Sequence, residues 1–240
     1  MARIDQVVVV VPARDEESLI GECLDALGEA VAHLRASRHT CAVAAVVVLD
    51  GCSDATPHVV ARRPWVHAVR VDLGVVGAVR AVGVAAGVAV AGAGHAEEGV
   101  WLAHTDADTR VPPSWLTTQV ALAAGGVDLV VGSVEPDPAD LDPHVLEGWH
   151  AAHVLAEDHH CVHGANLGVR LSAYQLVGGF RGLSVHEDVD LVRRVRAAGG
   201  VCRSTDRARV RTSGRRQGRV RGGFADFLAA LDPVTVDVAG

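Results

Sequence analysis

The stretch that decides the fold is VWLAHTDADTRVPPSWL, residues 100–116. Its apolar start, residues 100–103, predicts a buried strand, and a Pro-Pro pair shortly after prevents the strand from continuing. Asp106 and Asp108 follow the strand. Two ionised carboxylates this close at a buried strand end repel each other unless a positive group lies between them. Mg²⁺ or Mn²⁺ could be that group, because both ions prefer oxygen ligands. An aspartate-rich turn is the alternative, because Asp also favours turns and helix caps.

The residues around this stretch alternate between strand and helix patterns. Continuous apolar runs predict strands at 7–11, 43–49 and 129–131, and a short further strand is expected at 67–71. Apolar residues at helical spacing predict a helix at 17–35, and further helices are expected around 59–60 and, from small residues, at 75–93. Such alternation is typical of an α/β fold, a doubly wound, mostly parallel sheet with helices on both faces. Polar residues gather after strand ends, at 14–16, 50–54 and 106–108. Ligands bind at this edge of open α/β sheets, so we expect a binding site there.

The pattern changes after Gly132. Residues 135–143 are typical of a loop, 145–158 of a helix and 167–170 of a short strand, and residues 185–188 open a further helix. The tail carries several Arg residues and ends in an amphipathic FADFLAAL. We expect one domain over 1–240, in which 1–133 is the sheet-bearing half and 134–240 is an acceptor-facing half with the tail.

Composition narrows the classes of protein that fit. The chain has 240 residues, of which 49% are hydrophobic, enough for a sizeable core. Aromatic residues make up 3% and the net charge is −7, which disfavours a nucleic-acid partner. The five Cys residues are scattered without a C-x-x-C pair, which favours a reducing compartment over a disulfide framework. The apolar runs are too short or too rich in Gly for a signal peptide or a transmembrane segment, so we expect a soluble, cytoplasmic protein.

Taken in order, the motifs resemble those of the family 2 glycosyltransferases, which have the GT-A fold. The matching segments are VVVVVPARDEE, LDGCSDAT, GVVGAVRAVGVAAG, HTDADT, HGANLGVRLSAYQLVGGF and HEDVDLVRRV. Together they cover roughly Val7 to Gly200. The resemblance implies a nucleotide-diphospho-sugar donor, Mg²⁺ or Mn²⁺ as cofactor, and transfer of a hexose-like sugar to an acceptor hydroxyl.

The resemblance also implies roles for individual residues. Those expected around the donor are Pro12, Ala13, Arg14, Glu16, Asp50, Arg80, Asp106, Arg215, Arg216 and Arg219. Asp106 and Asp108 would hold the metal, Asp108 more directly. Asp188 would be the base that deprotonates the acceptor, with Glu187 beside it. Acceptor contacts would come from His163, Gly164, Ala165, Asn166 and His186, with His163 or His186 alternatively near the donor phosphates or the metal.

Elementary chemistry supports these implied roles. A divalent ion and Arg guanidinium groups stabilise the charge that develops on a diphosphate leaving group. Asp188 falls in the first turn of its expected helix, where the dipole favours an ionised carboxylate. An in-line attack by the activated hydroxyl would invert the anomeric carbon. The tail lacks the Gln-x-x-Arg-Trp motif of processive synthases, so we expect transfer of a single sugar from a UDP- or GDP-sugar.

Several alternatives stay open at this point. The charged segments could be helix starts, turn caps, a structural ion pair at Arg80 or a solvated face in the tail. The histidines at 159, 160 and 163 flank Cys161, but their spacing matches no standard closed zinc site, so zinc is not predicted. A retaining transferase, a nucleotidyltransferase or a non-catalytic nucleotide-sugar-binding protein would fit the same fold. A small-molecule or lipid acceptor and a homodimer are both compatible with the sequence.

Overall fold

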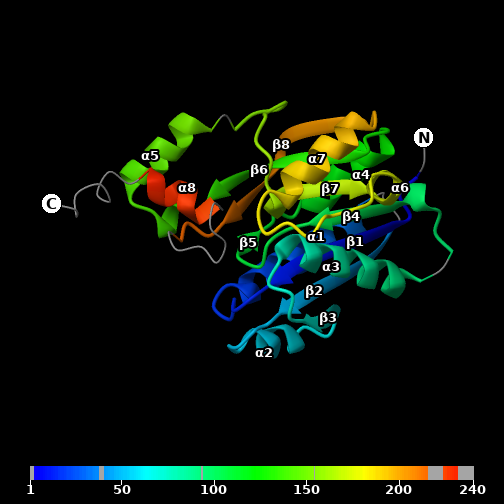
Figure 1. The fold of residues 1–240 in the computed structure, drawn as a ribbon, viewed down its shortest axis with the longest axis horizontal. Coiled ribbons are helices and arrows are strands. Elements are labelled where there is room, and N and C mark those ends of the chain that lie inside the picture. The colour runs from blue at the N-terminus through cyan, green and yellow to red at the C-terminus, as the bar shows by residue number, and fades with distance from the viewer. Residues whose placement is uncertain (1–2, 38–40, 93, 154, 216–223, 232–240) are drawn as a thin grey trace.

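The computed structural model describes residues 3–37, 41–92, 94–153, 155–215 and 224–231. Within them, the strands are β1 (Gln6–Ala13), β2 (Ala42–Asp50), β3 (Val66–Val71), β4 (Val100–His104), β5 (Thr109–Arg110), β6 (Leu129–Pro136), β7 (Leu167–Arg170) and β8 (Cys202–Thr212). They form one sheet in the order β3-β2-β1-β4-β7-β6-β8-β5 (Figure 1). The sheet therefore continues from the N-terminal half of the chain into the C-terminal half.

The sheet is mixed rather than purely parallel. β1 pairs in parallel with β2 and β4, β2 with β3, and β6 with β8. β7 runs antiparallel to both of its neighbours, β4 and β6, and β5 runs antiparallel to β8. The predicted doubly wound α/β fold is confirmed, and β7 is the strand at which its parallel part ends.

Helices cover both faces of the sheet. They are α1 (Ile20–Ala36), α2 (Thr56–Ala61), α3 (Val76–Ala91), α4 (Trp115–Ala124), α5 (Pro143–Ala152), α6 (Leu171–Leu176), α7 (Glu187–Ala197) and α8 (Phe224–Ala230), with 3-10 turns η1 (Glu97–Gly99), η2 (Pro138–Asp140) and η3 (Gly164–Asn166). α5 and α8 lie together at one end of the molecule, away from the centre of the sheet (Figure 1).

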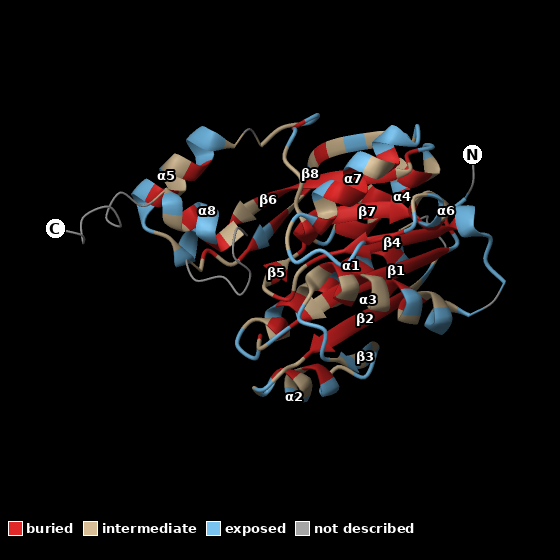
Figure 2. Ribbon diagram, viewed as in Figure 1, coloured by how far each residue is buried: buried red, intermediate tan, exposed pale blue. Residues whose placement is uncertain are grey.

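The valine run of β1 shows why this strand lies in the middle of the molecule. Val7, Val9 and Val11 enter the core cluster that contains the apolar faces of α1 and α4. Val8 and Val10 enter the opposite cluster, with residues of α3, α6 and α7. All five side chains are fully buried, and the central strands are buried throughout in Figure 2. A strand covered on both faces needs an uninterrupted apolar run, which is the pattern seen in the sequence.

Helix α3 packs unusually close to the sheet because it carries glycines at the contact. A Cβ added to Gly83 would overlap the side chain of Val10, and one added to Gly87 would overlap that of Val8. This close packing holds α3 against β1. Because Arg80 lies in the second turn of α3, the packing also holds the backbone of Arg80 in place.

The C-terminal half differs from the prediction in three places. The helix predicted over 145–158 ends at Ala152, and the loop predicted over 135–143 instead contains the end of β6 and the turn η2. Strand β8 was not predicted at all. Its sequence alternates charged and small residues and only part of the strand is buried, so it lacks the apolar run that marks the central strands.

None of the helices in the described part of the chain has the length and apolar character needed to cross a bilayer.

Candidate active site

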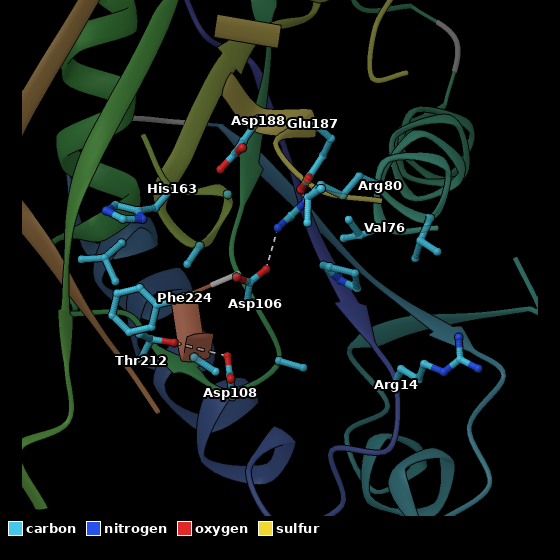
Figure 3. A pocket seen from close by; sticks show the side chains of 18 of the residues that line it. Arg14, Val76, Arg80, Asp106, Asp108, His163, Glu187, Asp188, Thr212 and Phe224 are labelled. Carbon is cyan, nitrogen blue, oxygen red and sulfur yellow. Dashed lines mark hydrogen bonds and ion pairs between the residues drawn. The ribbon is translucent and has the colours of Figure 1, made fainter. Parts of the chain in front are cut away.

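A cleft of about 980 Å³ opens at the carboxyl ends of β1, β2 and β4. Its walls come from the residues that follow these strands, the starts of α3 and α7, the turn η3, the end of β8 and the helix α8. This is the edge at which the sequence predicted a binding site. Figure 3 shows Asp106 near the centre of the cleft, with Arg80, Asp188 and Asp108 around it.

Arg80 is the buried cation of the cleft. Its Nη2 lies 2.6 Å from Oδ1 of Asp106, and its Nε lies 3.0 Å from Oε1 of Glu187. The Arg80 side chain is 2% exposed, and its Nη1 has no hydrogen-bond partner in the described structure. Burial raises the pKa of Glu187, an effect that the adjacent guanidinium opposes. The isolated charge in the apolar helix thus joins two acidic segments that are far apart in the sequence.

Gly164 makes room for this cation. A Cβ at Gly164 would lie 2.5 Å from Nη2 of Arg80 and 3.4 Å from Oε1 of Glu187. Any larger residue at position 164 would therefore displace the guanidinium or the turn.

A second charged group surrounds Asp108. Oδ2 of Asp108 lies 2.8 Å from Nη2 of Arg215, and Thr212 donates its hydroxyl to Oδ1 at 3.3 Å (Figure 3). Arg215 also donates to both carboxylate oxygens of Glu16, each at 2.8 Å. Burial raises the pKa of Asp108 to about 6. The carboxylate is ionised at neutral pH but poorly hydrated, so a nearby cation stabilises it.

Asp50 and Arg14 form the β1–β2 side of the cleft. Asp50 accepts hydrogen bonds from the backbone N–H of Leu73, at 2.7 Å, and of Gly74, at 3.1 Å. Nη1 of Arg14 lies 3.6 Å from Asp50, and the Arg14 side chain is 46% exposed. Asp50 thus holds the loop before α3, and its expected contact with the donor stays a prediction. Pro12 and Ala13 also line this side.

Asp188 lies in the first turn of α7 and lines the cleft beside Gly164 and Val189. Its Oδ1 accepts a hydrogen bond from the backbone N–H of Val189 at 2.7 Å. From its position in the first turn, the helix dipole is expected to favour the charged form. In the structure burial outweighs this effect and raises the pKa of Asp188 above its usual value.

The residues predicted at the acceptor side divide into two groups. His163, Gly164, Ala165 and His186 line the cleft. Asn166 does not belong to the lining. Its Oδ1 accepts a hydrogen bond from Nε1 of Trp115, and its Nδ2 donates to the carbonyl oxygens of Ser133 and Ala208. The Asn166 side chain is buried and ties η3 to β6 and β8, so we do not include it among the acceptor contacts proposed below.

The tail and α8 complete the wall. Arg215 reaches the cleft, whereas Arg216 and Arg219 lie outside the described residues. Sequence reasoning missed Phe224 and Phe227 of α8, Val134 of β6 and His153 at the end of α5, all of which line the cleft. Only the amphipathic pattern of FADFLAAL signalled that this segment packs against another part of the protein.

Known structures share this fold. The chain resembles TarS residues 1–349 of S. aureus in complex with UDP, with 15% identity, a TM-score of 0.59 and coverage of 88% of this chain and 61% of that one. A mannosyltransferase from Pyrobaculum calidifontis in complex with GDP-Man and Mn²⁺ gives 22% identity, a TM-score of 0.58 and coverage of 90% and 59%. GalNAc-T7 in complex with UDP, GalNAc and Mn²⁺ gives 10% identity and a TM-score of 0.62, with coverage of 90% of this chain and 46% of that one. At these identities the likeness shows the fold alone, the GT-A fold, and the chain spans less than two thirds of each of these proteins.

Family models extend the comparison to the sequence itself. A search of curated proteins gave no match. The model described as "Glycosyl transferase family group 2" matches residues 101–229. The model described as "Glycosyl transferase family 2" matches residues 8–147, more than half of the chain. The chain therefore belongs to glycosyl transferase family 2.

Proposed function

We propose that this protein moves a single sugar from a UDP- or GDP-sugar to an acceptor hydroxyl, in a reaction that depends on a divalent metal and inverts the anomeric carbon. The observation that carries the proposal is the convergence of Asp106, Asp108 and Asp188 on one cleft that also holds Arg80 and Arg215. Two of the carboxylates can hold a divalent metal, and the third can act as a base. The two guanidinium groups can bind the negative charge of a diphosphate leaving group.

The groups around Asp108 fit a divalent ion. Carboxylate oxygens of Asp106 and Asp108 and the hydroxyl of Thr212 are hard oxygen ligands, the kind that Mg²⁺ and Mn²⁺ prefer. The poor hydration of Asp108 favours any cation that binds there. When bound, the ion would neutralise negative charge on the diphosphate. The Mn²⁺ complexes of the mannosyltransferase and of GalNAc-T7 support this assignment.

The donor would lie along the β1–β2 side of the cleft. Nη1 of Arg80 is buried without a partner in the described structure, so it can donate to an oxygen of the diphosphate. Arg215 would contribute a second guanidinium. Arg14 and Asp50 would face the nucleoside. UDP in the TarS complex and GDP-Man in the mannosyltransferase complex support a nucleotide donor of one of these two kinds.

Asp188 would act as the base. Burial raises its pKa above that of a solvated Asp, which makes the ionised carboxylate a better proton acceptor. It removes the proton of the acceptor hydroxyl as that oxygen attacks the anomeric carbon. The bond to the diphosphate breaks on the opposite side, and the nucleoside diphosphate leaves. Glu187, held by Arg80, would serve as a positioning residue that fixes the guanidinium.

The acceptor side of the cleft has a partly apolar wall. Phe224 and Phe227 of α8 line it with Val134 and Val162, and Phe227 is 40% exposed. Apolar side chains at a site opening favour a ligand with an apolar part. We therefore propose an acceptor that carries its hydroxyl next to an apolar group, as a small aglycone or a lipid does.

A donor-cleavage assay tests the proposal. The protein is incubated with a panel of UDP- and GDP-sugars and apolar alcohol acceptors, with Mn²⁺, Mg²⁺ or EDTA, and release of nucleoside diphosphate and the anomeric configuration of the product are measured. We expect metal-dependent turnover with one donor class and an inverted product. Asp188→Asn should lower transfer by roughly 10²–10⁴-fold, and Asp108→Asn should remove the response to metal. Asp25→Asn, on the exposed side of α1, is the matched control and should change neither.

The outcomes separate the alternatives. Unchanged transfer in Asp188→Asn would exclude this residue as the base, and a retained configuration would exclude inversion. Pyrophosphate release from a nucleoside triphosphate and a sugar phosphate would identify a nucleotidyltransferase. Donor binding without turnover across the acceptor panel would indicate a non-catalytic binding protein.

A further inference from the structure

A group of soft metal ligands lies at the acceptor side of the cleft, apart from the acidic site. It consists of His153, Cys161 and His163, whose ligand atoms all lie within 4.8 Å of one another. His153 follows α5, whereas Cys161 and His163 belong to the segment that leads into η3. The group is therefore assembled by the fold, which is why the sequence spacing gave no standard zinc pattern.

We infer that these three residues form a zinc site. Two imidazole nitrogens and one thiolate are ligands that Zn²⁺ binds well, whereas Mg²⁺ and Mn²⁺ prefer oxygen. Atoms that share one zinc ion lie roughly 3.3–3.8 Å apart, from Zn–N bonds of about 2.0 Å and a Zn–S bond of about 2.3 Å. The three ligand atoms, now within 4.8 Å of one another, would have to move closer by side-chain rotation to share one ion. Binding releases the Cys161 thiol proton to solvent, since the thiolate is the ligand.

The surroundings of His153 prepare it for this role. Its Nδ1 lies 3.1 Å from the carbonyl oxygen of Trp149, and its ring stacks on the Trp149 ring with the centroids 4.4 Å apart. An imidazole that donates Nδ1–H to a carbonyl presents the lone pair of Nε2. This is the arrangement usual for a metal-ligating histidine.

The other two ligands have no competing hydrogen bond. In the described structure neither the thiol of Cys161 nor the ring of His163 makes one. The rings of His163 and Phe224 lie nearly perpendicular, with their centroids 5.9 Å apart. The buried ring of His159 also has both nitrogens unpartnered there, but it falls outside the group, so we leave it out of the ligand set. Three protein ligands leave a fourth position open for water or an oxygen of the acceptor.

The proposed ion would connect two walls of the cleft. His153 and His163 both line it, and His153 also packs against Phe227 of α8, with the ring centroids 5.1 Å apart. Zinc would thus tie the end of α5 to the segment before η3. Neither of these segments belongs to a central strand, so a metal cross-link would fix their separation.

Metal titration of the 240-residue chain tests this inference. Protein freed of metal with EDTA and a desalting column is titrated with Zn²⁺, and in parallel with Co²⁺, whose thiolate charge-transfer band reports a Cys ligand. We expect one tightly bound ion per chain at the His/Cys group, weaker binding at the acidic site, and a cobalt–thiolate band. Cys161→Ser should abolish the band, and both Cys161→Ser and His163→Gln should lower zinc affinity by more than about 100-fold, because loss of mere outer-shell partners already costs about 10–100-fold.

Matched controls keep the result specific to these residues. Cys202→Ser and His160→Ala change the same residue types outside the group, and Asp108→Asn changes the acidic site, so all three should bind zinc as the wild type does. Circular dichroism checks that each variant is folded. Less than one zinc per chain at micromolar concentration, or wild-type affinity in folded Cys161→Ser, would overturn the inference. Because the titration involves no nucleotide or acceptor, its result is independent of the proposed transferase activity.

Discussion

Arg80 is the residue whose loss should damage the cleft most. It pairs with a buried Glu187 and with Asp106, and its own side chain is buried. Removing one partner from a buried pair leaves uncompensated charge, which typically costs about 3–5 kcal/mol. We expect Arg80→Met to lower the free energy of unfolding by about 3 kcal/mol, near the lower end because Asp106 is 37% exposed. Urea denaturation measures this change.

A double-mutant cycle isolates the pair. Glu187→Gln in the Arg80→Met background should recover part of the lost stability, since a neutral amide no longer needs the guanidinium. Arg207→Met is the control, because Arg207 and its partner Glu157 are both exposed and such pairs contribute less than about 1 kcal/mol. Equal losses in Arg80→Met and Arg207→Met would contradict the view that the buried pair supports the cleft.

Some residues of the cleft could be predicted from the sequence and others could not. Asp106, Asp108 and Asp188 could be placed in one cleft because they follow strands or open a helix at a known edge of the fold. Asn166 belonged to the same resemblance, yet its side chain is used by Trp115 and two backbone carbonyls. Those partners come from distant segments, and no local pattern reports them. His153 was missed for the same reason.

Helix α3 offers a test of packing at the scale of one element. Alanine has a higher helix propensity than glycine, so Gly→Ala in an open helical position stabilises by about 0.5–1 kcal/mol. Gly28 of α1 is such a position, since its nearest contact would be Trp65 at an ordinary 3.6 Å. At Gly83 the added methyl would instead overlap Val10 of β1. We expect Gly28→Ala to raise the melting temperature and Gly83→Ala to lower stability by about 1–3 kcal/mol. Stabilisation by both substitutions would show that α3 can move away from the sheet.

Helix α7 carries a cluster of ion pairs around Asp190, and the contribution of this cluster to stability should depend on pH. Asp190 is buried, which alone would raise its pKa, but the hydrogen bonds from Arg194 and Arg193 prevail and lower it. A lowered pKa in the folded state means that the contribution to stability is complete above the usual pKa of about 3.9. It is lost as the pH falls through the lower, folded value.

Comparing wild type with Asp190→Asn isolates this contribution. We expect the variant to be less stable by about 1.5–3 kcal/mol at pH 7, the range for hydrogen bonds to charged groups, and the difference to shrink between pH 4 and pH 2. Chemical denaturation at several pH values measures it. A difference that stays constant over this range would mean that Asp190 keeps its usual pKa in the folded protein.

The elements themselves were predictable to different degrees. β1, β2 and β4 are buried on both faces over most of their length, so their continuous apolar runs predicted them directly. β8 is half-exposed, with Arg and Asp between small residues, and it is held in the sheet by pairing with β6 and β5. Its strand character therefore depends on neighbours rather than on its own composition. The antiparallel direction of β7 could not be predicted from its own residues either, because the direction of a strand depends on how the chain connects it to its neighbours.

At the scale of the whole molecule, the cleft collects segments from the entire described chain. Its lining begins at Pro12 and ends at Phe227, and it includes residues that follow three strands of the sheet. Unfolding of any large part of the protein would therefore destroy the site. A ligand that binds only the folded protein must then stabilise all of it, by an amount set by concentration and affinity.

Ligand binding to the folded protein should therefore raise its melting temperature. With Mn²⁺ and the correct nucleoside diphosphate at about 100 times its dissociation constant, the stability gain is about 2.7 kcal/mol. For a chain of this size that corresponds to a rise in melting temperature of roughly 5–10 °C. We expect either UDP or GDP to give this rise and EDTA to reduce it. Asp108→Ala should abolish the metal-dependent part, whereas Asp158→Asn, at an exposed position, should retain it. If neither nucleotide at millimolar concentration shifts the melting temperature, the donor site proposed here is wrong, even though the family and the fold stand.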